Sequence, residues 1–403
     1  MEKAKTVVLG VTGGIACYKA ASLASGLVKR GYNVEVILTE HATQFIGPHT
    51  FESLTHNRVM VDTFDRNFPH HVEHVALADK ADLLVVAPAT ANVIAKAAHG
   101  IADDMLTTTI LACDCEKLMV PAMNTRMYGN PVTQDNLDTL RKYGWHILEP
   151  AVGRLACGAT GAGKMPEPED ILEAVDHLIS HEKDLADLRV LVTAGPTMEA
   201  LDPVRYLTNH SSGRMGYAIA AAAAARGAAV TLISGPTHLK KPAFVETVDV
   251  RSADDMFEAV RQRADQQDII IKAAAVADFR PVQIASEKIK KGTDDQLSIP
   301  LVRTNDILAW LGQHRRPGQY LCGFSMETQN MLENSRRKLR AKKVDMIAAN
   351  NLKEEGAGFG VATNRLTLIT ADSEQTLPLL SKEAAAHRLL DAICAARKVG
   401  MHR

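Results

Sequence analysis

TVVLGVTGG at residues 6–14 and RVLVTAGPT at residues 189–197 each join an apolar run to a loop of small residues. This pattern is typical of a buried β-strand that ends in a glycine-containing loop, which lets backbone amides approach a phosphate group. The two stretches lie in different halves of the chain. We therefore predict two α/β domains, with one nucleotide-type site in each.

The rest of both halves continues the alternation of buried strands and helices. In the first half, apolar runs at residues 34–39, 83–88 and 117–121 alternate with helical patterns at 16–30 and 92–101, which indicates a parallel sheet covered on both faces. Strands of the second half are predicted at residues 190–193, 230–234, 268–276, 320–324 and 345–349, before a helix at 381–397. The predicted fold class is α/β, with two doubly wound, Rossmann-like domains.

The boundary between the two domains is predicted after an amphipathic helix at residues 170–181. The charged stretch 181–187 follows this helix and leads into the strand that starts the second half. We place the domains at residues 1–187 and 188–403. A chain of 403 residues is long enough for two hydrophobic cores, because one domain typically takes about 100–200 residues.

The overall composition excludes several functional classes. The chain has 46% hydrophobic and 23% charged residues and a formal net charge of -1, which gives no electrostatic reason to bind nucleic acid or an anionic membrane. Its 6 cysteines form neither a paired framework nor a CxxC motif, and no apolar stretch is long enough to cross a membrane. We expect a cytoplasmic protein that binds small molecules, with no nucleic-acid and no membrane partner.

Small and neutral hydrogen-bonding residues gather where the predicted strands of the first half end. Such residues at the carboxyl edge of a sheet suit a planar flavin ring and its phosphate. The candidates are Gly13, Gly14, Thr39, Pro88, Ala89, Thr90, Ala91, Asn92, Met123 and Asn124. Small residues are common at strand ends, so each loop is a weak signal and only their combination indicates a planar cofactor.

Three polar side chains of the first half are candidates for catalysis. Asn124 is a neutral amide that suits a substrate carboxylate, although a lone Asn is often a turn or helix-cap residue. His70 and His71 fit surface histidines at a helix start, whereas the apolar residues that follow His74 suit a position at a pocket edge as a general base. A metal site formed by His74 with His71 lacks a further ligand at a suitable spacing. Cys157, in the glycine-rich stretch 153–165, fits a mobile flap, where its thiol either donates a proton or has no chemical role.

The second half presents hydrogen-bond donors and cations near the ends of predicted strands. The loop TAGPTMEALDPVRYLTNHSSGRMG, residues 193–216, includes Asn209 and either binds phosphate groups or is an elaborate surface turn. EKIKKG, which follows the strand leading to Asp278, contains Lys288 and suits a triphosphate or simply a solvated face. Lys338 and Lys342 are one helical turn apart and face either the same anion or solvent.

Together these motifs resemble those of a known family. LVTAGPTMEALDPVRYLTNHSSGRMG, KAAAVADFRP and EKIKK are similar to segments of the bifunctional phosphopantothenoylcysteine decarboxylase/phosphopantothenate-cysteine ligases of bacterial coenzyme A biosynthesis. The resemblance covers essentially the whole chain. It implies an FMN-dependent decarboxylase domain of flavodoxin-like fold at residues 1–187 and a CTP-dependent ligase domain at residues 188–403.

For the first domain, the resemblance implies that FMN oxidises the substrate thiol before CO2 leaves and returns the hydride afterwards. His74 matches the catalytic histidine, Asn124 matches the asparagine that engages the substrate carboxylate, and Cys157 matches the flap cysteine that protonates the enethiolate. Tyr128 stands near the position where the family often has Trp. The implied FMN-binding residues are Gly13, Gly14, Ile15, Thr39, Pro88, Ala89, Thr90, Ala91, Asn92 and Met123.

For the second domain, the resemblance implies that CTP activates 4'-phosphopantothenate as an acyl-cytidylate, from which cysteine displaces CMP. Asn209 matches the residue that handles this intermediate, and Lys288 matches a lysine needed to form it. The implied CTP-binding residues are Lys272, Ala273, Ala274, Asp278, Lys288, Asn305, Asp306, Ile307, Leu308, Phe324, Lys338 and Lys342. Asn305 replaces a proline that is usual in the family. Mg²⁺ would be held mainly by the nucleotide phosphates, and we assign no protein ligands to it.

The family also implies a homo-oligomer, in which trimeric flavin domains and dimeric ligase domains give a dodecamer. Two other functions compete with this interpretation. A non-enzymatic regulatory protein of the flavin fold is disfavoured because His74, Asn124 and Cys157 are all present beside a ligase-like half. A nicotinamide-dependent dehydrogenase would need GxGxxG with an acidic residue about 20 positions later, and neither half supplies that pair.

Overall fold

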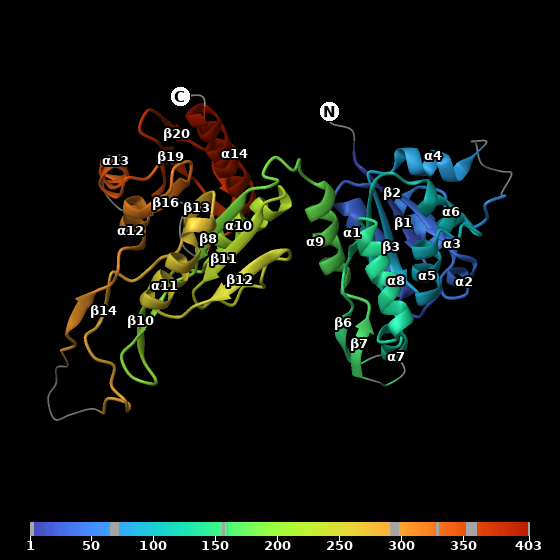
Figure 1. Ribbon diagram of the computed structural model, residues 1–403, viewed down its shortest axis with the longest axis horizontal. Helices are drawn as coiled ribbons and strands as arrows, with labels where there is room; N and C mark the ends of the chain where they lie inside the picture. Colours follow the sequence, from blue (N-terminus) through green and yellow to red (C-terminus); the bar gives the residue numbers. More distant parts are fainter. Residues whose placement is uncertain are drawn as a thin grey trace. The chain divides into compact units, whose positions relative to one another are not determined.

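The computed structural model describes residues 4–64, 72–154, 158, 160–290, 298–327, 330–351 and 361–401. The chain divides into two compact units, Met1–His181 and Glu182–Arg403, and each has its own sheet and hydrophobic cores (Figure 1). Among the helices in these ranges, none combines the length and hydrophobicity that a membrane span requires.

The described sheet of the first unit has five parallel strands in the order β2-β1-β3-β4-β5. Its strands are β1 (Thr6–Val11), β2 (Asn33–Leu38), β3 (Leu83–Ala89), β4 (Glu116–Pro121) and β5 (His146–Ile147). All residues of β1 and β3 are buried, which explains why these strands are continuous apolar runs in the sequence.

Helices cover both faces of this first sheet. Side chains alternate along β1, so that Val7 and Leu9 pack in a core with α1, α3 and α9, whereas Val8 packs in a second core with α4, α5, α6 and α8. The helices are α1 (Cys17–Lys29), α2 (Glu40–Thr43), α3 (Pro48–Thr55), α4 (Glu73–Lys80), α5 (Ala91–His99), α6 (Met105–Ala112), α7 (Thr125–Tyr128), α8 (Pro131–Lys142) and α9 (Pro168–Ile179). The doubly wound fold predicted for the first half is confirmed.

The second unit is built on a larger sheet, whose described strands follow the order β12-β11-β8-β13-β16-β17-β19-β20. They are β8 (Arg189–Ala194), β11 (Ala229–Ser234), β12 (Val245–Asp249), β13 (Ile269–Lys272), β16 (Tyr320–Glu327), β17 (Met346–Asn351), β19 (Thr367–Ile369) and β20 (Glu374–Thr376). In this order, the strands from β12 through β17 pair in parallel, whereas β19 and β20 add an antiparallel edge.

Two helical layers enclose the second sheet as well. Val190 and Val192 of β8 pack in a core with α10 and α14, and Leu191 packs in a core on the opposite face with α11, α12 and α13. These helices are α10 (Arg214–Ala225), α11 (Ala253–Arg263), α12 (Ile307–His314), α13 (Met331–Lys342) and α14 (Lys382–Met401). The second unit is therefore also doubly wound.

One predicted strand is wrong at its end, and four small two-stranded sheets among the described residues were not predicted. The strand expected at residues 268–276 stops at Lys272, because the N–H of Ala274 donates to the hydroxyl of Thr193 (3.2 Å), and only an isolated parallel bridge between Pro196 and Ala275 continues the β8–β13 register. Three are hairpins: β6 (Ala151–Arg154) with β7 (Thr160–Lys164), β9 (Met198–Ala200) with β10 (Tyr206–Thr208), and β14 (Phe279–Pro281) with β15 (Leu301–Arg303). The fourth pairs β18 (Thr363–Asn364) with β21 (Leu380–Ser381), and β19 and β20 lie between them in the chain.

The glycine at the start of α10 lets this helix lie directly on β8. A Cβ atom at Gly216 would lie 2.5 Å from the Cβ of Ala194 and 3.0 Å from the carbonyl oxygen of Thr193. We expect Gly216→Val to lower the free energy of unfolding of the second unit by about 2–3 kcal/mol through overpacking. Urea denaturation followed by circular dichroism measures this loss.

Ala221 provides a matched control, because it lies on the same helix and is exposed. Ala221→Val should cost less than about 1 kcal/mol, the difference in helix propensity. Equal losses for the two variants would show that close packing at Gly216 is not required.

Candidate active sites

A cavity of about 610 Å³ opens at the carboxyl edge of the first sheet. The strand order changes direction between β1 and β3, because β2 and β3 lie on opposite sides of β1. Loops diverge at such a point in open α/β sheets and leave room for a ligand. The cavity is lined by Gly13, Gly14, Ile15, Ala16, Tyr18, Lys19, Pro88, Thr90, Ala91, Ala122, Met123, Asn124, Met127, Arg154, Gly163, Lys164 and Met165.

The buried hydroxyl of Thr12 joins two of the loops around this cavity. It donates to the carbonyl of Pro88 (2.7 Å) and accepts from the N–H of Thr90 (3.0 Å). The next residue, Gly13, has no room for a side chain, since a Cβ atom would lie 2.5 Å from the Cβ of His41. A Cβ atom at Gly14 would meet no atom within 4 Å, so a flat ligand can approach the backbone there.

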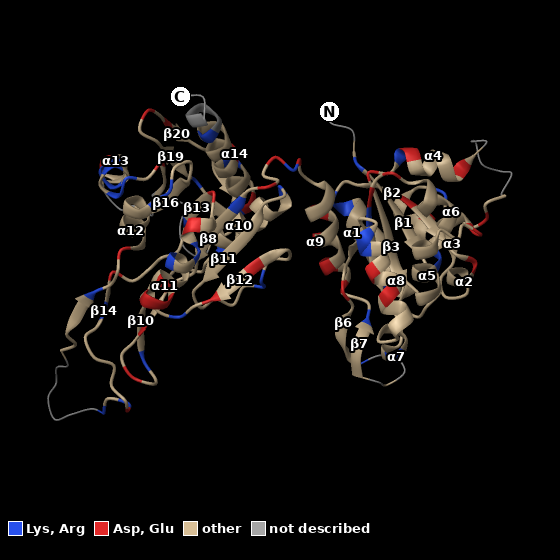
Figure 2. Cartoon of the chain, in the orientation of Figure 1, with Lys and Arg blue, Asp and Glu red and all other residues tan. Residues whose placement is uncertain are grey.

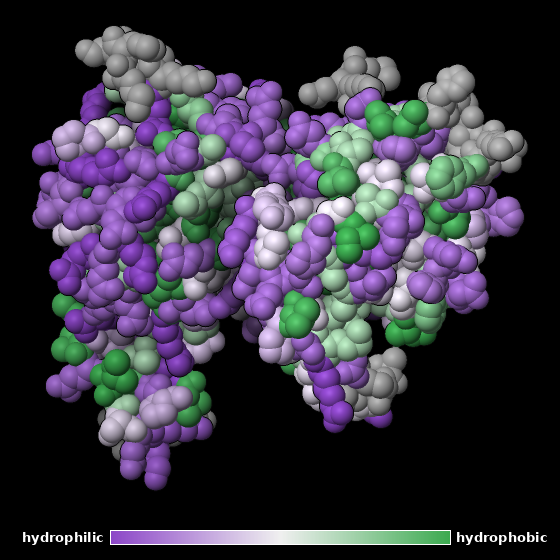
Figure 3. All heavy atoms as spheres, turned by 45° about the vertical axis from the view of Figure 1, so that its right-hand side comes forward, coloured by the Kyte–Doolittle hydropathy of each residue, from purple (hydrophilic) through white to green (hydrophobic). Residues whose placement is uncertain are grey.

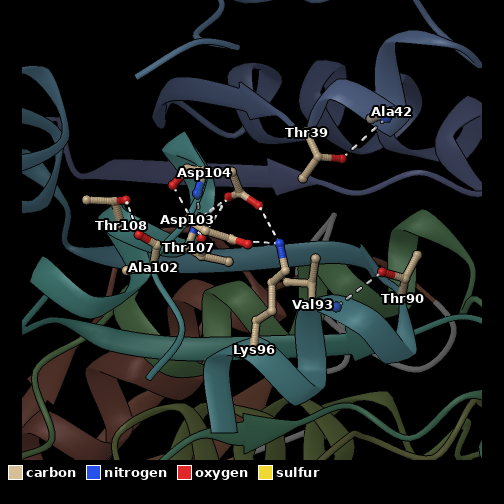
Figure 4. Close-up of polar contacts among 10 residues, drawn as sticks. All are labelled: Thr39, Ala42, Thr90, Val93, Lys96, Ala102, Asp103, Asp104, Thr107 and Thr108. Atoms are coloured by element: carbon tan, nitrogen blue, oxygen red, sulfur yellow. Dashed lines mark hydrogen bonds and ion pairs between the residues drawn. The ribbon is translucent and has the colours of Figure 1, made fainter. Parts of the chain in front are cut away.

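The structure brings together most of the residues predicted for the flavin. Those that line the cavity are Gly13, Gly14, Ile15, Pro88, Thr90, Ala91 and Met123. Thr39, Ala89 and Asn92 do not line it. Figure 4 shows that Thr39 caps α2 by accepting from the N–H of Ala42 (3.3 Å), as Thr90 caps α5 by accepting from the N–H of Val93 (3.4 Å).

An ion-pair network joins α5 to the residues at the start of α6. The Lys96 ammonium contacts Asp103 Oδ1 at 2.6 Å and Asp104 Oδ2 at 3.3 Å (Figure 4). Asp104 also caps α6 by accepting from the N–H of Thr107 (2.8 Å). The network therefore fixes the helix whose first turn faces the cavity.

The three catalytic candidates of the first unit have different positions. Asn124 lines the cavity and caps α7, since its Oδ1 accepts from the N–H of Arg126 (2.9 Å). His74 is half-buried in the first turn of α4 and does not line the cavity. Cys157 lies outside the described residues. In the described part of the chain, no group of three or more His, Cys, Asp or Glu residues is placed to hold a metal ion.

The β6–β7 hairpin contributes cavity residues that the sequence pattern did not indicate. Gly163 of β7 lies so close to the loop after β4 that its carbonyl accepts from the N–H of Met123 (3.0 Å). The buried ammonium of Lys19 donates to Glu167 (2.9 Å) and to the carbonyl of Met165 (3.3 Å), just beyond β7. In the sequence, this contact is indicated only by Lys19 itself, which interrupts an otherwise apolar face of α1.

A second cavity, of about 360 Å³, lies in the other unit at the carboxyl end of β13. Its lining contains eight of the residues predicted for CTP, and these are Lys272, Asp278, Asn305, Asp306, Ile307, Leu308, Lys338 and Lys342. The remaining lining residues, Val276, Phe279, Arg303 and Thr304, were not predicted. Ala273, Ala274, Lys288 and Phe324 do not line it. Basic residues reach the cavity from β13, from β15 and from α13, which is marked by Lys and Arg along its length (Figure 2).

The cations of this second cavity are held by specific contacts. Burial, and then the nearby charge of Lys338, lower the pKa of Lys272 to about 8. Lys338 donates to the carbonyl of Phe324 (2.8 Å), and Lys342 pairs with Asp306. Burial opposes ionisation of Asp306, but hydrogen bonds from Lys342 and from the N–H of Ala309 hold its pKa below the usual range. The arrangement suits a polyanion such as a nucleotide triphosphate.

Asn209 lies next to the point where the order of the second sheet changes direction, between β8 and β13. Its side-chain amide donates to the carbonyl of Ala275 (3.0 Å). The hydroxyl of Thr197 accepts from the N–H of Ala277 (3.0 Å), and the hydroxyl of Thr304 donates to the carbonyl of Ala277 (2.6 Å). Asn209 is thus tied to the loop that leads into the second cavity.

Two family models match the chain, one on each unit. The family described as Flavoprotein matches residues 1–180, and the DNA/pantothenate metabolism flavoprotein C-terminal domain matches residues 185–396. A coenzyme A biosynthesis bifunctional protein CoaBC of Bacillus subtilis is 47% identical over 398 residues, and the match covers 98% of each chain. The chain belongs to the CoaBC family. It is a bifunctional enzyme of coenzyme A biosynthesis, with phosphopantothenoylcysteine decarboxylase and phosphopantothenate-cysteine ligase activities.

The chain is also similar to other members of the family and to parts covered by solved structures. CoaBC of Vibrio vulnificus is 43% identical and covers 96% of this chain, and CoaBC of Mycobacterium bovis is 45% identical with the same coverage. The crystal structure of a CoaBC C-terminal domain is 44% identical and covers 52% of this chain and 96% of its own, with a TM-score of 0.45. A PPC decarboxylase mutant complexed with pantothenoylaminoethenethiol is 30% identical and covers 43% of this chain and 97% of its own, with a TM-score of 0.39.

The lowered pKa of Lys272 gives the second cavity a defined pH dependence. Lys272 is protonated and attracts an anion below pH about 8, and it becomes neutral as the pH rises through that value. The affinity of this cavity for a polyanion such as inorganic triphosphate should therefore fall by about tenfold between pH 7.5 and 9.5, because the protonated fraction of Lys272 falls about tenfold for each pH unit above its pKa. Isothermal titration calorimetry measures this decrease.

Lys272→Arg is the control, because a guanidinium stays protonated throughout this range. The pH dependence should largely disappear in this variant. A tenfold decrease that persists in Lys272→Arg would mean that another group titrates.

Proposed function

We propose that the first unit binds FMN in the 610 Å³ cavity and decarboxylates 4'-phosphopantothenoylcysteine to 4'-phosphopantetheine, and that the second unit binds CTP in the 360 Å³ cavity and ligates cysteine to 4'-phosphopantothenate. The observation that carries the proposal is the contrast between the two cavities. Of the 17 residues that line the first cavity, 14 are uncharged and the charged ones are Lys19, Arg154 and Lys164. Of the 12 residues that line the second cavity, six are charged and four of these are cationic. A flavin and a triphosphate require these different surroundings.

The lining of the first cavity fits FMN. Gly14 leaves the backbone open to a flat ring, and the loops after β1 and β3 present backbone groups and the hydroxyl of Thr90. Bound FMN supplies reversible two-electron chemistry. We propose that Asn124 holds the substrate carboxylate beside it, because a neutral amide binds a carboxylate without the strong pairing that would oppose its loss as CO2.

Proton transfers in the first unit are proposed for His74 and Cys157, as base and acid. His74 does not line the cavity of a single chain, which is compatible with a flavin site near a subunit contact. The proposed assembly is a homo-oligomer, and by family analogy a dodecamer. Apolar side chains at the surface support association, since Phe279, Val282, Ile284 and Leu301 near the β14–β15 hairpin are all more than one-third exposed. On the face drawn in Figure 3, small groups of apolar residues lie among hydrophilic ones.

In the second unit, the proposed reaction has two steps. The carboxylate of 4'-phosphopantothenate attacks the α-phosphorus of CTP and pyrophosphate leaves, and then the amine of cysteine attacks the acyl carbon and CMP leaves. We propose that Lys272, Lys338 and Lys342 bind the phosphates, that Mg²⁺ is carried mainly by the phosphates, and that Lys288 and Asn209 assist formation and use of the acyl-cytidylate. The free thiols of the described cysteines fit the reducing cytoplasm, which remains the predicted location.

Asn209→Asp tests the ligase site. A carboxylate in place of the amide removes a donor and repels the anionic intermediate, so ligase activity should fall by about 100-fold. The assay measures pyrophosphate release from 4'-phosphopantothenate, cysteine and CTP. Release of CO2 from supplied 4'-phosphopantothenoylcysteine should stay within about twofold of the unmodified enzyme, and its loss would contradict separate sites.

Asn124→Asp is the matched change in the other unit. The new carboxylate repels the carboxylate of the substrate, so CO2 release should fall by about 100-fold while pyrophosphate release is unchanged. Retention of the flavin absorbance in the purified variant shows that the cavity is intact. If CO2 release persists at the original rate, Asn124 does not contact the departing group.

A further inference from the structure

The turn of the β9–β10 hairpin carries a carboxylate that is completely buried. Asp202 lies in the sequence LDPVR, residues 201–205, and its side chain is 0% exposed. It lines neither of the two cavities, and the sequence pattern assigns it no role. Because a buried carboxylate is costly unless its oxygens accept hydrogen bonds, its partners indicate its function.

Five donor groups converge on the two oxygens of Asp202. Oδ1 accepts from the backbone N–H of Val204 and of Arg205, each at 2.8 Å. Oδ2 accepts from Nε (3.0 Å) and Nη2 (2.6 Å) of Arg205, and from the backbone N–H of Ile289 at 3.1 Å. Burial opposes ionisation, but these hydrogen bonds hold the pKa of Asp202 well below its usual range. Asp202 is therefore a charged acceptor at neutral pH.

Ile289 is held at both of its backbone polar groups. Its N–H donates to Asp202, and its carbonyl accepts from Nη2 of Arg205 at 2.7 Å. A further bond runs from the N–H of Ala285 to the carbonyl of Leu201 at 3.0 Å. The turn thus fixes a segment that is distant in sequence. Lys288, the exposed lysine that immediately precedes Ile289, belongs to this fixed segment.

The same hairpin fixes Asn209 at its other end. Glu199 of β9 is buried and accepts from the N–H of Ala253, at the start of α11 (2.9 Å). The hydroxyl of Thr208, the last residue of β10, donates to the carbonyl of Thr197 (2.8 Å). Asn209 follows directly and donates to Ala275. The β9–β10 hairpin therefore contacts the segment that contains Lys288 through its turn, and Asn209 directly follows its second strand.

We propose that Asp202 is a positioning residue of the ligase, which acts through Ile289 to set the place of Lys288 relative to Asn209. The inference rests on the ligase roles proposed above for these two residues. Closure of the hairpin turn needs only the bonds from Val204 and Arg205. The bond to Ile289 joins residues that are 87 positions apart and adds nothing to the turn itself, so a purely local role leaves it unexplained.

The first test compares two Asp→Asn variants in the full-length enzyme. Asp202→Asn keeps the size of the side chain but replaces a charged acceptor by a neutral one. We expect kcat for pyrophosphate release to fall by about tenfold while KM for CTP changes by less than about twofold. Asp345→Asn is the control, since Asp345 likewise accepts from a backbone N–H, that of Leu321 (2.8 Å), and pairs with Arg315 (2.9 Å), but lines neither cavity.

The second test is a double-mutant cycle with Lys288→Gln. If Asp202 acts through Lys288, then adding Asp202→Asn to Lys288→Gln lowers kcat by less than about a further twofold. If instead the fold-decreases in kcat of the two single variants multiply in the double variant, Asp202 does not act through Lys288, although the role of Lys288 itself stands. Full activity of Lys288→Gln rejects the proposed role of Lys288 and, with it, the reason for positioning it.

A third measurement needs no catalysis. Trypsin cleaves after lysine, and the N–H of the Lys288–Ile289 peptide bond is the one that donates to Asp202. Mass spectrometry should show cleavage at this bond about tenfold faster in Asp202→Asn than in the unmodified enzyme or in Asp345→Asn, because the segment opens more often. Equal cleavage rates in all three proteins would show that Asp202 does not hold the segment.

Discussion

The close approach of neighbouring strand-end loops is the constraint on which both sites depend. In each sheet, a buried threonine hydroxyl at the end of one strand hydrogen-bonds to the end of the strand across the change in order. Thr12 does so with Pro88 and Thr90, and Thr193 accepts from the N–H of Ala274 (3.2 Å). A hydroxyl both donates and accepts, so it can connect two loops whose backbone groups would otherwise remain unpaired. Beyond these connections the loops separate, and a cavity opens.

The two cavities share this origin but differ in electrostatics. The loops of the first unit bring small, neutral residues to the sheet edge, whereas Lys272 ends a strand of the second unit and meets lysines from α13. A half-buried lysine with a lowered pKa stores an unfavourable interaction that an anion relieves when it binds. Under the proposed functions, the same architecture serves a flavin in one half of the chain and a polyphosphate in the other.

Much of the fold was predictable, because strands buried on both faces are continuous apolar runs, as in β1 and β8. The strand-end residues followed from the rule that parallel strands end at one edge. The hairpins were not predictable, since strands of two to five partly exposed residues carry little periodic pattern. At Thr39, the sequence also cannot distinguish a helix cap from a ligand contact, because a threonine hydroxyl after a strand suits both roles. Asp202 was missed because an acidic residue in a turn is normally solvated, and its burial depends on a partner 87 residues away.

The self-contained cores of the first unit have a consequence for biosynthesis on the ribosome. Its sheet and both of its cores use only residues before position 182, so its native contacts are complete while the second unit of the chain has still to be made. At about 5–20 residues per second, translation of a segment of roughly 220 residues takes on the order of 10–45 s. A nascent chain can therefore complete the fold of its decarboxylase unit, and form the 610 Å³ cavity, before the ligase unit exists.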